Sequence, residues 1–363
     1  MALQVGIIGL PNSGKSTIFN AITRAGAAVA GYPFCTVEPN IGAVGVPDRR
    51  LKDVAGAAGC RKVVPADIRV VDIAGLVEGA HRGEGLGNQF LAHIREADAI
   101  AHAVRCFESP NVAHVRATID PAEDIAVVNT ELILADLETV ERRRGRIAKA
   151  AQTGDREKAR EVEVLGKVEQ GLNDAVAVRS QGLNANEMEI LAGLFLLTAK
   201  PVIYVANLGE EQLGEDGEWA RAVSSAAEAE GAKTVAFSAK LESEIEELEP
   251  DEVREFLEAY GIEDLGLDEF IAHCYALLGL ITFFTTESGE CRAWPLRVGS
   301  TALQAAGKIH TDMEKGFIKA EVMSWEDFLA YGSFHAAREK GAARVEGREY
   351  LVKDGEVILF RFS

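Results

Sequence analysis

Residues 9–16 of the chain read Gly-Leu-Pro-Asn-Ser-Gly-Lys-Ser, which matches the pattern G-x-x-x-x-G-K-[ST] at every fixed position. The stretch follows a short apolar segment, residues 3–9, that is predicted to be a buried strand, and it precedes a predicted helix over residues 15–24. In this context the glycines let the loop curl so that successive backbone N–H groups point at phosphate groups. The sequence therefore predicts a phosphate-binding loop and, with it, a nucleoside triphosphatase.

Lys15 and Ser16 are the first candidate functional residues. A lysine at this position of the loop reaches the β- and γ-phosphates, and the hydroxyl of the next residue binds Mg²⁺. The helix that begins here also presents its positive N-terminal end to the same anion. We therefore expect Lys15 to be catalytic and Ser16 to be a ligand of Mg²⁺.

A D-x-x-G pattern from Asp72 to Gly75 ends a second predicted strand over residues 68–72. Asp72 is expected to lie beside Mg²⁺, through a water molecule, and to act in catalysis, while the Gly75 N–H is expected to meet the γ-phosphate. Thr36 lies in the loop 32–40, where a threonine can complete the Mg²⁺ shell when the γ-phosphate is present. From spacing alone, a plain loop hydroxyl is an equally good interpretation of Thr36.

The stretch Asn207-Leu208-Gly209-Glu210 follows a predicted strand over residues 201–206, at the place where GTPases of this type carry N-K-x-D. The aspartate of that motif accepts hydrogen bonds from guanine, whereas the extra methylene of Glu210 displaces the carboxylate. Sites built to pair with a ligand's donors discriminate strongly, and sites without such groups do not. We therefore expect guanine specificity to be lost and ATP to be accepted or preferred, with backbone groups around Asn207 and Leu208 as the partners of adenine.

A further predicted strand over residues 234–237 is followed by Ser238-Ala239-Lys240. This tripeptide resembles the S-A-K loop that lies behind the base in GTPases. Ser238 and Ala239 are therefore candidate nucleotide-binding residues.

Leu76 stands directly after D-x-x-G, where Ras-like proteins carry the glutamine that orients the attacking water. Leucine cannot orient a water molecule, so either hydrolysis is slow or another group does so. His114 follows a strand end and could swing toward the γ-phosphate as a catalytic residue, although a histidine beside apolar residues is more often structural. Asn12 could instead help to hold a monovalent cation such as K⁺ against the phosphates, or it could only brace the loop.

Apolar strands alternate with helical stretches through most of residues 1–280, which predicts a doubly wound, mostly parallel α/β sheet. Residues 129–198 interrupt this alternation. Apolar residues there recur near a 3.5-residue spacing on both sides of a polar break at 152–155, with many charged residues between them. The pattern predicts a coiled-coil helical hairpin inserted between two strands, and two ordinary surface helices are the alternative.

From Ile281 onward the pattern changes to short β-rich stretches around one helix. We expect an α+β domain over residues 281–363, following a nucleotide-binding domain over residues 1–280. A turn is predicted at Asp354-Gly355. The expected helix covers residues 302–313, and the expected strands cover residues 281–285, 292–296, 317–322, 350–352 and 357–362.

Charge and composition limit the possible partners. The 363-residue chain has a net charge of −19, so its overall field does not favour nucleic acid. Residues 281–363 have 11 Lys and Arg against 12 Asp and Glu, which makes this nearly neutral segment the better candidate for touching RNA.

Five scattered cysteines without a CxxC pair argue for a reducing compartment. With no apolar run near the ~20 residues of a membrane span and no secretory signal, we expect a cytoplasmic protein.

Several long stretches together resemble the YchF subfamily of Obg-like P-loop NTPases, and the resemblance covers essentially the whole chain. It implies a G domain with a coiled-coil insertion and a C-terminal TGS domain of the β-grasp type. It also implies an ATPase, rather than a GTPase, that associates with the ribosome. The stretches are GLPNSGKST (residues 9–17), YPFCTVEPN (32–40), DIAGLVEGAHRGEGLGNQFL (72–91), the N-x-x-E at 207–210, and AAGKIHTDMEKGFIKAEV (305–322).

Residue roles also follow from the resemblance. It implies that Mg²⁺ is bound by Ser16 and Thr36, and that the ribosome is the partner, with ribosomal RNA contacted through the C-terminal and coiled-coil modules. Two alternatives stay open: a GTPase switch, or a binding protein whose main role needs no hydrolysis, which Leu76 motivates. The nucleotide-binding residues implied are Asn12, Ser13, Gly14, Lys15, Ser16, Thr17 and Leu208.

Overall fold

Contacts between residues divide the chain into two compact units. The first consists of Met1–Ala21, Val37–Gly42 and Val70–Glu269, and the second of Ile22–Thr36, Ala43–Arg69 and Phe270–Ser363. The computed structural model describes residues 3–30, 41–73, 75, 79, 86–109, 118–153, 155–213, 217–245, 248, 250–260, 266–287 and 289–363.

A six-stranded sheet in the order β2-β4-β1-β5-β6-β7 forms the nucleotide-binding part of the fold. The pairs β1–β5, β5–β6 and β6–β7 are parallel. Every residue of β5 and β6 is buried, as expected for parallel strands that are covered on both faces. The predicted mostly parallel α/β sheet is confirmed. Its strands are β1 (Gln4–Ile8), β2 (Ile41–Gly45), β4 (Asp67–Asp72), β5 (Ala99–Cys106), β6 (Val202–Leu208) and β7 (Lys233–Phe237).

Helices cover this sheet. Ile94 of α3 (Leu86–Glu96), Val128 of α4 (Pro121–Gln152) and Val223 of α7 (Glu218–Ala229) lie in one apolar cluster with Ile8 and Val104 of the strands. Burial of such side chains supplies most of the stability of a domain, at roughly 25 cal/mol per Å² of apolar surface. The other helices named here are α1 (Lys15–Ala30), α6 (Ala185–Leu191), α8 (Ala239–Ile245), α9 (Pro250–Tyr260) and α10 (Gly266–Leu277).

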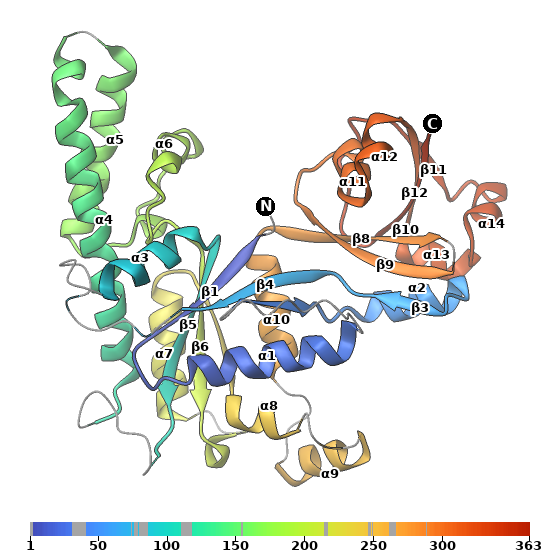
Figure 1. Cartoon of the computed structure of the whole chain (residues 1–363), viewed down its shortest axis with the longest axis horizontal. Coiled ribbons are helices and arrows are strands. Elements are labelled where there is room, and N and C mark those ends of the chain that lie inside the picture. The colour runs from blue at the N-terminus through green and yellow to red at the C-terminus, as the bar shows by residue number, and fades with distance from the viewer. Residues whose placement is uncertain are drawn as a thin grey trace. The chain divides into compact units, whose positions relative to one another are not determined.

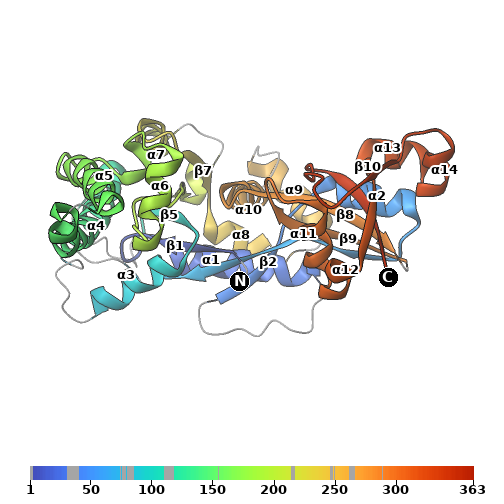
Figure 2. The same ribbon diagram turned by 90° about the horizontal axis from the view of Figure 1, so that it is seen from above.

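The predicted helical hairpin is confirmed as α4 and α5 (Arg156–Asn173), which rise together from the sheet in Figure 1 and are seen end-on, side by side, in Figure 2. Asp120 caps α4 through the Glu123 N–H, and Asp155 caps α5. The periodic apolar residues form one buried cluster, which holds the two helices together. Its members include Ile133, Val140, Ile147, Val164, Leu165, Val168 and Leu172.

The C-terminal part of the chain forms the second sheet, in the order β11-β10-β12-β8-β9-β3. The β8–β9 hairpin is antiparallel, β12 lies parallel to β8, and β10 lies antiparallel to β12, with α11 (Ala302–Ile309) between β9 and β10 in the chain. This order is that of the predicted β-grasp fold, which is confirmed. The strands are β3 (Lys62–Val64), β8 (Leu280–Glu287), β9 (Glu290–Arg297), β10 (Phe317–Ser324), β11 (Arg344–Glu346) and β12 (Glu356–Phe362).

The division into units differs from the one expected at residue 280, because Ala43–Arg69 belongs with the C-terminal residues. Strand β3 pairs in parallel with β9 at the edge of the second sheet. At the start of α2 (Arg49–Ala58), Arg50 Nη1 lies 2.7 Å from Asp354 Oδ2, and Asp354 Oδ1 accepts a hydrogen bond from the Thr282 N–H at 2.8 Å. The turn at 354–355 therefore also binds a segment from the first quarter of the chain.

Two local predictions for the C-terminal sheet are wrong. The helix expected over 302–313 is divided at His310 into α11 and α12 (Thr311–Lys315), because His310 has an extended backbone and its side chain caps α12. Residues 350–352 form only an isolated bridge, between Thr301 and Leu351. Helices α13 (Trp325–Tyr331) and α14 (Phe334–Glu339) lie between β10 and β11 in the chain.

Among the residues that the structure describes, no helix combines the length and apolar character needed to cross a membrane.

Candidate nucleotide site

The phosphate-binding loop lies between β1 and α1, as the sequence predicts. Its two glycines have positive φ angles of +150° at Gly9 and +91° at Gly14. A Cβ at Gly9 would lie 2.3 Å from the carbonyl oxygen of Ala103, and a Cβ at Gly14 would lie 2.0 Å from Asn207 Nδ2. Both the backbone conformation and the available space therefore require glycine at these positions.

Asn12, at the tip of the loop, has a φ of +66° and is exposed. Asparagine adopts this left-handed conformation more readily than most residues. The geometry gives a structural reason for asparagine here.

Lys15 and Ser13 are buried polar residues inside the loop. Lys15 is only 7% exposed, and its ammonium donates a hydrogen bond to the Leu10 carbonyl at 2.7 Å. Burial lowers the pKa of Lys15 from 10.5 to about 8, an effect that the nearby Asp72 carboxylate opposes. Ser13 Oγ is buried and has no hydrogen-bond partner in the part of the chain that the structure describes. A loop with a buried cation and an unsatisfied hydroxyl is suited to an anion that satisfies both.

Ser16 and Asp72 meet at the start of α1 and the end of β4. The Ser16 hydroxyl donates a hydrogen bond to Asp72 Oδ2 at 2.7 Å. A hydroxyl and a carboxylate are the oxygen donors that Mg²⁺ prefers, and this ion is commonly held by one or two protein groups together with substrate phosphates. No group of three or more His, Cys, Asp or Glu side chains suited to a metal exists among the described residues. The donor set thus fits Mg²⁺ that arrives with a nucleotide.

Gly75 of the D-x-x-G pattern lies against the phosphate-binding loop. A Cβ at this position would be 3.2 Å from Lys15 Nζ and 3.2 Å from Pro11 Cα. The structure therefore brings Asp72, Gly75, Lys15 and Ser16 together, as the sequence analysis expects.

Asn207 connects the phosphate-binding loop to the segment after β7. Its side chain is 4% exposed, Nδ2 donates to the Ser13 carbonyl at 3.0 Å, and Oδ1 accepts from the Ala239 N–H at 3.1 Å. Both ends of the amide are thus occupied. The side chain of Asn207 fixes the loop, and Ala239 takes part through its backbone.

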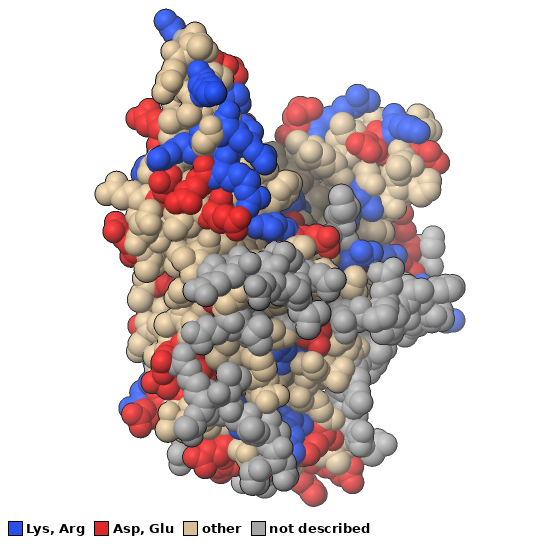
Figure 3. Space-filling view, turned by 60° about the vertical axis from the view of Figure 1, so that its left-hand side comes forward, with Lys and Arg blue, Asp and Glu red and all other residues tan. Residues whose placement is uncertain are grey.

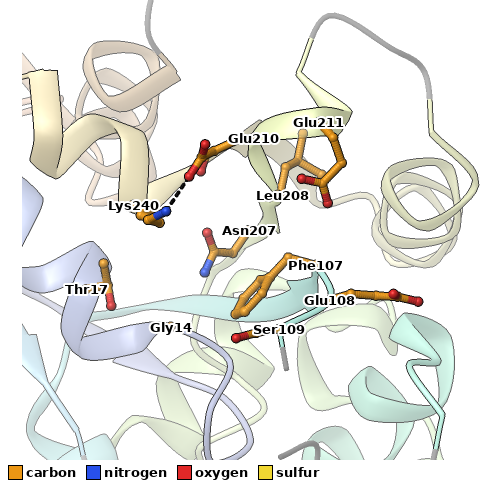
Figure 4. Close-up of a pocket in the computed structure, with 12 residues that line it drawn as sticks. Gly14, Thr17, Phe107, Glu108, Ser109, Asn207, Leu208, Glu210, Glu211 and Lys240 are labelled. Atoms are coloured by element: carbon orange, nitrogen blue, oxygen red, sulfur yellow. Dashed lines mark hydrogen bonds and ion pairs between the residues drawn. The ribbon is translucent and has the colours of Figure 1, made fainter. Parts of the chain in front are cut away.

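A cavity of about 600 Å³ opens beside this connection. Its volume lies in the range of small-molecule sites. Figure 4 shows Asn207 between Thr17 and Phe107, with Glu210 and Lys240 reaching toward each other at the rim. The lining residues are Gly14, Thr17, Phe107, Glu108, Ser109, Asn207, Leu208, Gly209, Glu210, Glu211, Ser238 and Lys240.

Glu210 forms an ion pair with Lys240. The hydrogen bond to Glu210 raises the pKa of Lys240. The carboxylate that stands in place of the guanine-reading aspartate is therefore already paired with a cation at the edge of the cavity.

Sequence reasoning missed Phe107, Glu108 and Ser109 as lining residues. They directly follow β5, and in open parallel sheets ligands bind beyond the carboxyl ends of the strands. This rule could have found them. Arg105 contacts the same segment, since its Nε donates to the Phe107 carbonyl at 3.1 Å.

Three of the residues singled out in the sequence, Thr36, Leu76 and His114, lie outside the described residues. Their expected roles stay predictions.

Comparisons with known proteins agree with this geometry. Residues 4–136 match a family model described as a 50S ribosome-binding GTPase, and residues 280–363 match the model of the YchF GTPase C-terminal domain, described as a protein of unknown function. The ribosome-binding ATPase YchF of Bacillus subtilis (strain 168) is 47% identical over 365 residues, and that of Escherichia coli O157:H7 is 48% identical over 363, with 100% of each chain covered.

The chain belongs to the YchF family.

A solved YchF structure also matches over nearly the whole chain. The Schizosaccharomyces pombe YchF GTPase superimposes with a TM-score of 0.90 at 35% identity, covering 99% of this chain and 97% of that one. The YchF assignment and the phosphate-binding loop together place the chain among the nucleoside triphosphatases. YchF relatives are named both ATPase and GTPase, so the names alone do not decide the base.

Proposed function

We propose that the protein is a Mg²⁺-dependent ATPase that binds the ribosome and acts in the cytoplasm as a nucleotide-dependent switch in translation. The single observation that carries the nucleotide part is the loop that encloses the buried Lys15 and leads directly to the Ser16–Asp72 hydrogen bond. The ribosome part rests on the names of the relatives and on the charge of the hairpin.

The phosphates would be held by the backbone N–H groups of residues 12–17 and by the Lys15 ammonium. A charged lysine in a water-poor site stabilises the negative charge that moves onto the leaving oxygens during hydrolysis. The hydrogen bond to the Leu10 carbonyl holds the Lys15 ammonium inside the loop. Gly75 would offer its N–H to the γ-phosphate, a role supported by its closeness to the loop, since a Cβ built at Gly75 would lie 3.2 Å from both Lys15 Nζ and Pro11 Cα.

Ser16 would hold Mg²⁺ directly, with Thr36 completing the shell and Asp72 acting through water. The ion supplies charge neutralisation between the β- and γ-phosphate oxygens. The attacking water would be oriented by His114, since Leu76 cannot do so. We further propose that Asn12 helps to hold K⁺ against the phosphates; an unchanged rate when K⁺ is replaced by Na⁺ would reject this role.

Adenine would occupy the cavity beside Asn207, held by backbone groups of Asn207 and Leu208 and by the Ser238–Ala239 segment. The ion pair with Lys240 supports this choice of base. Guanine would need the Glu210 carboxylate as an acceptor for its two donors, and it would have to compete with an ammonium group. Adenine lacks these two donors, so the pairing of Glu210 with Lys240 would not weaken its binding.

The hairpin offers a basic surface for ribosomal RNA. Residues 141–160 contain eight Lys and Arg but only three Asp and Glu, in a chain whose net charge is −19. Figure 3 shows these blue side chains gathered along one side of the hairpin. Arg146, Lys149, Arg156 and Arg160 are exposed, and such cations bind phosphates with a strong dependence on salt.

The C-terminal sheet uses part of its positive charge internally. Arg338 and Arg361 pair with the buried Glu321, and Arg344 pairs with the buried Glu356. In the hairpin, too, part of the positive charge is paired, so its contact with RNA would depend on the four exposed cations named above. We choose the hairpin over the nearly neutral residues 281–363 because its cations are concentrated within twenty residues. The paired hairpin cations are Arg142, Arg143, Arg144 and Lys158.

Co-sedimentation with ribosomes tests the proposal. In the presence of a non-hydrolysable ATP analogue, the parent should sediment with ribosomes, and the triple variant Lys149→Ala, Arg156→Ala, Arg160→Ala should bind about tenfold more weakly, with a flatter salt dependence. The matched control removes three exposed C-terminal lysines, Lys308, Lys315 and Lys340. Equal losses in the two triple variants would reject the hairpin as the contact, and no binding by the parent in any nucleotide state would reject the ribosome as partner.

A further inference from the structure

We propose that Glu131, in the hairpin helix α4, is a positioning residue for hydrolysis that holds the loop after D-x-x-G through the backbone N–H of Gly79. Glu131 Oε1 accepts a hydrogen bond from Gly79 N at 2.7 Å, across 52 positions of the sequence, and Glu131 is only 4% exposed. The inference rests on the proposed nucleotide hydrolysis and deepens it.

Gly79 and Gly75 are the two described points of this loop. Gly75 lies against Lys15 and Pro11 of the phosphate site. Gly79 has a φ of +86°, in the region that favours glycine. Since Gly79 is four residues after Gly75, even a fully extended connection spans no more than about 14 Å. Fixing Gly79 therefore anchors the segment that follows Gly75 within this distance of the phosphate-binding loop.

The part of α4 that carries Glu131 is itself firmly held. On one side of it, Asn129 Nδ2 donates to the Tyr204 hydroxyl at 3.1 Å and to Glu230 Oε1 at 2.8 Å. On the other side, the buried Asp136 accepts hydrogen bonds from the N–H groups of Leu197 and Thr198. Glu131 thus projects from a fixed section of helix, which is what a residue that positions another group requires.

The same helix carries the basic surface of the hairpin. Helix α4 runs without a break from Pro121 to Gln152; Glu131 lies in the part that packs against the sheet, beside Val128 and Leu132, and the basic residues follow it in the chain. Helix α4 therefore carries both the basic surface and the side chain that holds Gly79.

Two substitutions of Glu131 distinguish the effect of side-chain length from the effect of charge. Glu131→Gln keeps the length of the side chain and an oxygen that can accept from Gly79, whereas Glu131→Asp keeps the charge but shortens the side chain by one methylene. Thr130→Ala is the matched control, because Thr130 is the exposed neighbour whose hydroxyl donates a hydrogen bond within α4, to the Ala126 carbonyl. The measurements are kcat and KM for ATP, Tm, and amide exchange of the peptide containing Gly79.

We expect Glu131→Asp to lower kcat about tenfold or more while KM changes by less than about threefold, because the loss concerns the transition state rather than binding. Exchange at Gly79 should become faster in this variant only. Glu131→Gln should keep kcat within about threefold of the parent, and Thr130→Ala should match it.

Parental kcat and parental exchange in Glu131→Asp would overturn the inference. If kcat fell equally in Glu131→Gln and Glu131→Asp, and Tm fell with it, the inference would also be overturned, because Glu131 would then only support the fold. Failure of the parent to hydrolyse any nucleotide would reject the proposed function instead, and the exchange comparison at Gly79 would still decide whether Glu131 holds the loop.

Discussion

The Ser16 hydroxyl donates a hydrogen bond to Asp72 Oδ2 at 2.7 Å, although 56 positions separate the two residues. The contact joins the first turn of α1 to the end of β4, so it fixes the geometry between the phosphate-binding loop and the D-x-x-G segment. Both oxygens are suited to the coordination sphere of Mg²⁺. Binding of the metal nucleotide should therefore depend on the charge of Asp72 more than on its shape.

Replacing Asp72 by asparagine tests this dependence. The amide keeps the size of the side chain but loses the charge, so turnover with Mg²⁺ should fall about tenfold or more, while ATP binding in EDTA should not weaken. The control is Asp67→Asn, at the exposed start of the same strand. ATP affinity and turnover are measured with and without Mg²⁺ in each protein. If Mg²⁺ increased both as much in Asp72→Asn as in the parent, the assigned role would be contradicted.

The lowered pKa of Lys15 predicts proton uptake on nucleotide binding. Burial lowers this pKa to about 8, so in the nucleotide-free protein Lys15 is charged below this pH and loses its proton above it. Bound phosphates favour the charged form, and ATP affinity should therefore fall as pH rises through about 8. Calorimetric titration with ATP at a pH about half a unit above this pKa, in two buffers of different ionisation enthalpy, should show that a proton is taken up on binding. Equal observed enthalpies in the two buffers would refute the prediction.

The ion pair between Glu210 and Lys240 predicts a change in base preference when it is broken. In Lys240→Ala the Glu210 carboxylate is free to accept from guanine, so GTP affinity should rise while ATP affinity stays the same. The gain should be only about two- to fivefold, because exposed ion pairs contribute about 0–1 kcal/mol. Lys240→Arg keeps the pair and should keep the parental ratio of affinities. A parallel change for ATP and GTP would show that the pair does not affect the choice of base.

His102 on β5 predicts a loss of stability in acid. Burial, together with the smaller effect of the positive charges of Arg179 and Lys15, lowers its pKa to about 3. The unfolded chain, with a histidine pKa of ~6.5, binds a proton more readily, so the contribution of His102 to stability is complete above that pH and is lost as pH falls toward about 3. Urea unfolding at two pH values should show a smaller acid loss in His102→Gln than in the parent. Identical pH dependence in both proteins would reject this account.

Local sequence signals were sufficient for the phosphate-binding loop and the hairpin. Gly9, Gly14 and Lys15 occupy fixed positions of the phosphate-loop pattern, and the two glycines have the positive φ angles that this loop requires. The spacing of Ile133, Val140 and Ile147 directly predicts a buried helical face. In both cases the deciding residues are close together in the chain, so a short pattern contains the information.

Long-range contacts could not be predicted in this way. Strand β3 is three residues long and pairs with β9, which lies more than 200 residues later in the chain. The contacts of Arg50 with Asp354 and of Glu131 with Gly79 depend on the same long-range folding. The basic end of the hairpin was hidden in a charge total taken over residues 1–280, because many acidic residues elsewhere outweigh it.

Calorimetric titration of the protein with ATP and GTP in parallel, with Mg²⁺ and K⁺ present and followed by turnover measurements, tests the central claim most directly. We predict that ATP binds at least about tenfold more tightly than GTP, a difference of about 1.4 kcal/mol, and that ATP is hydrolysed. Tighter binding of GTP would contradict the interpretation of the cavity around Asn207 and Glu210 and would make the protein a GTPase switch.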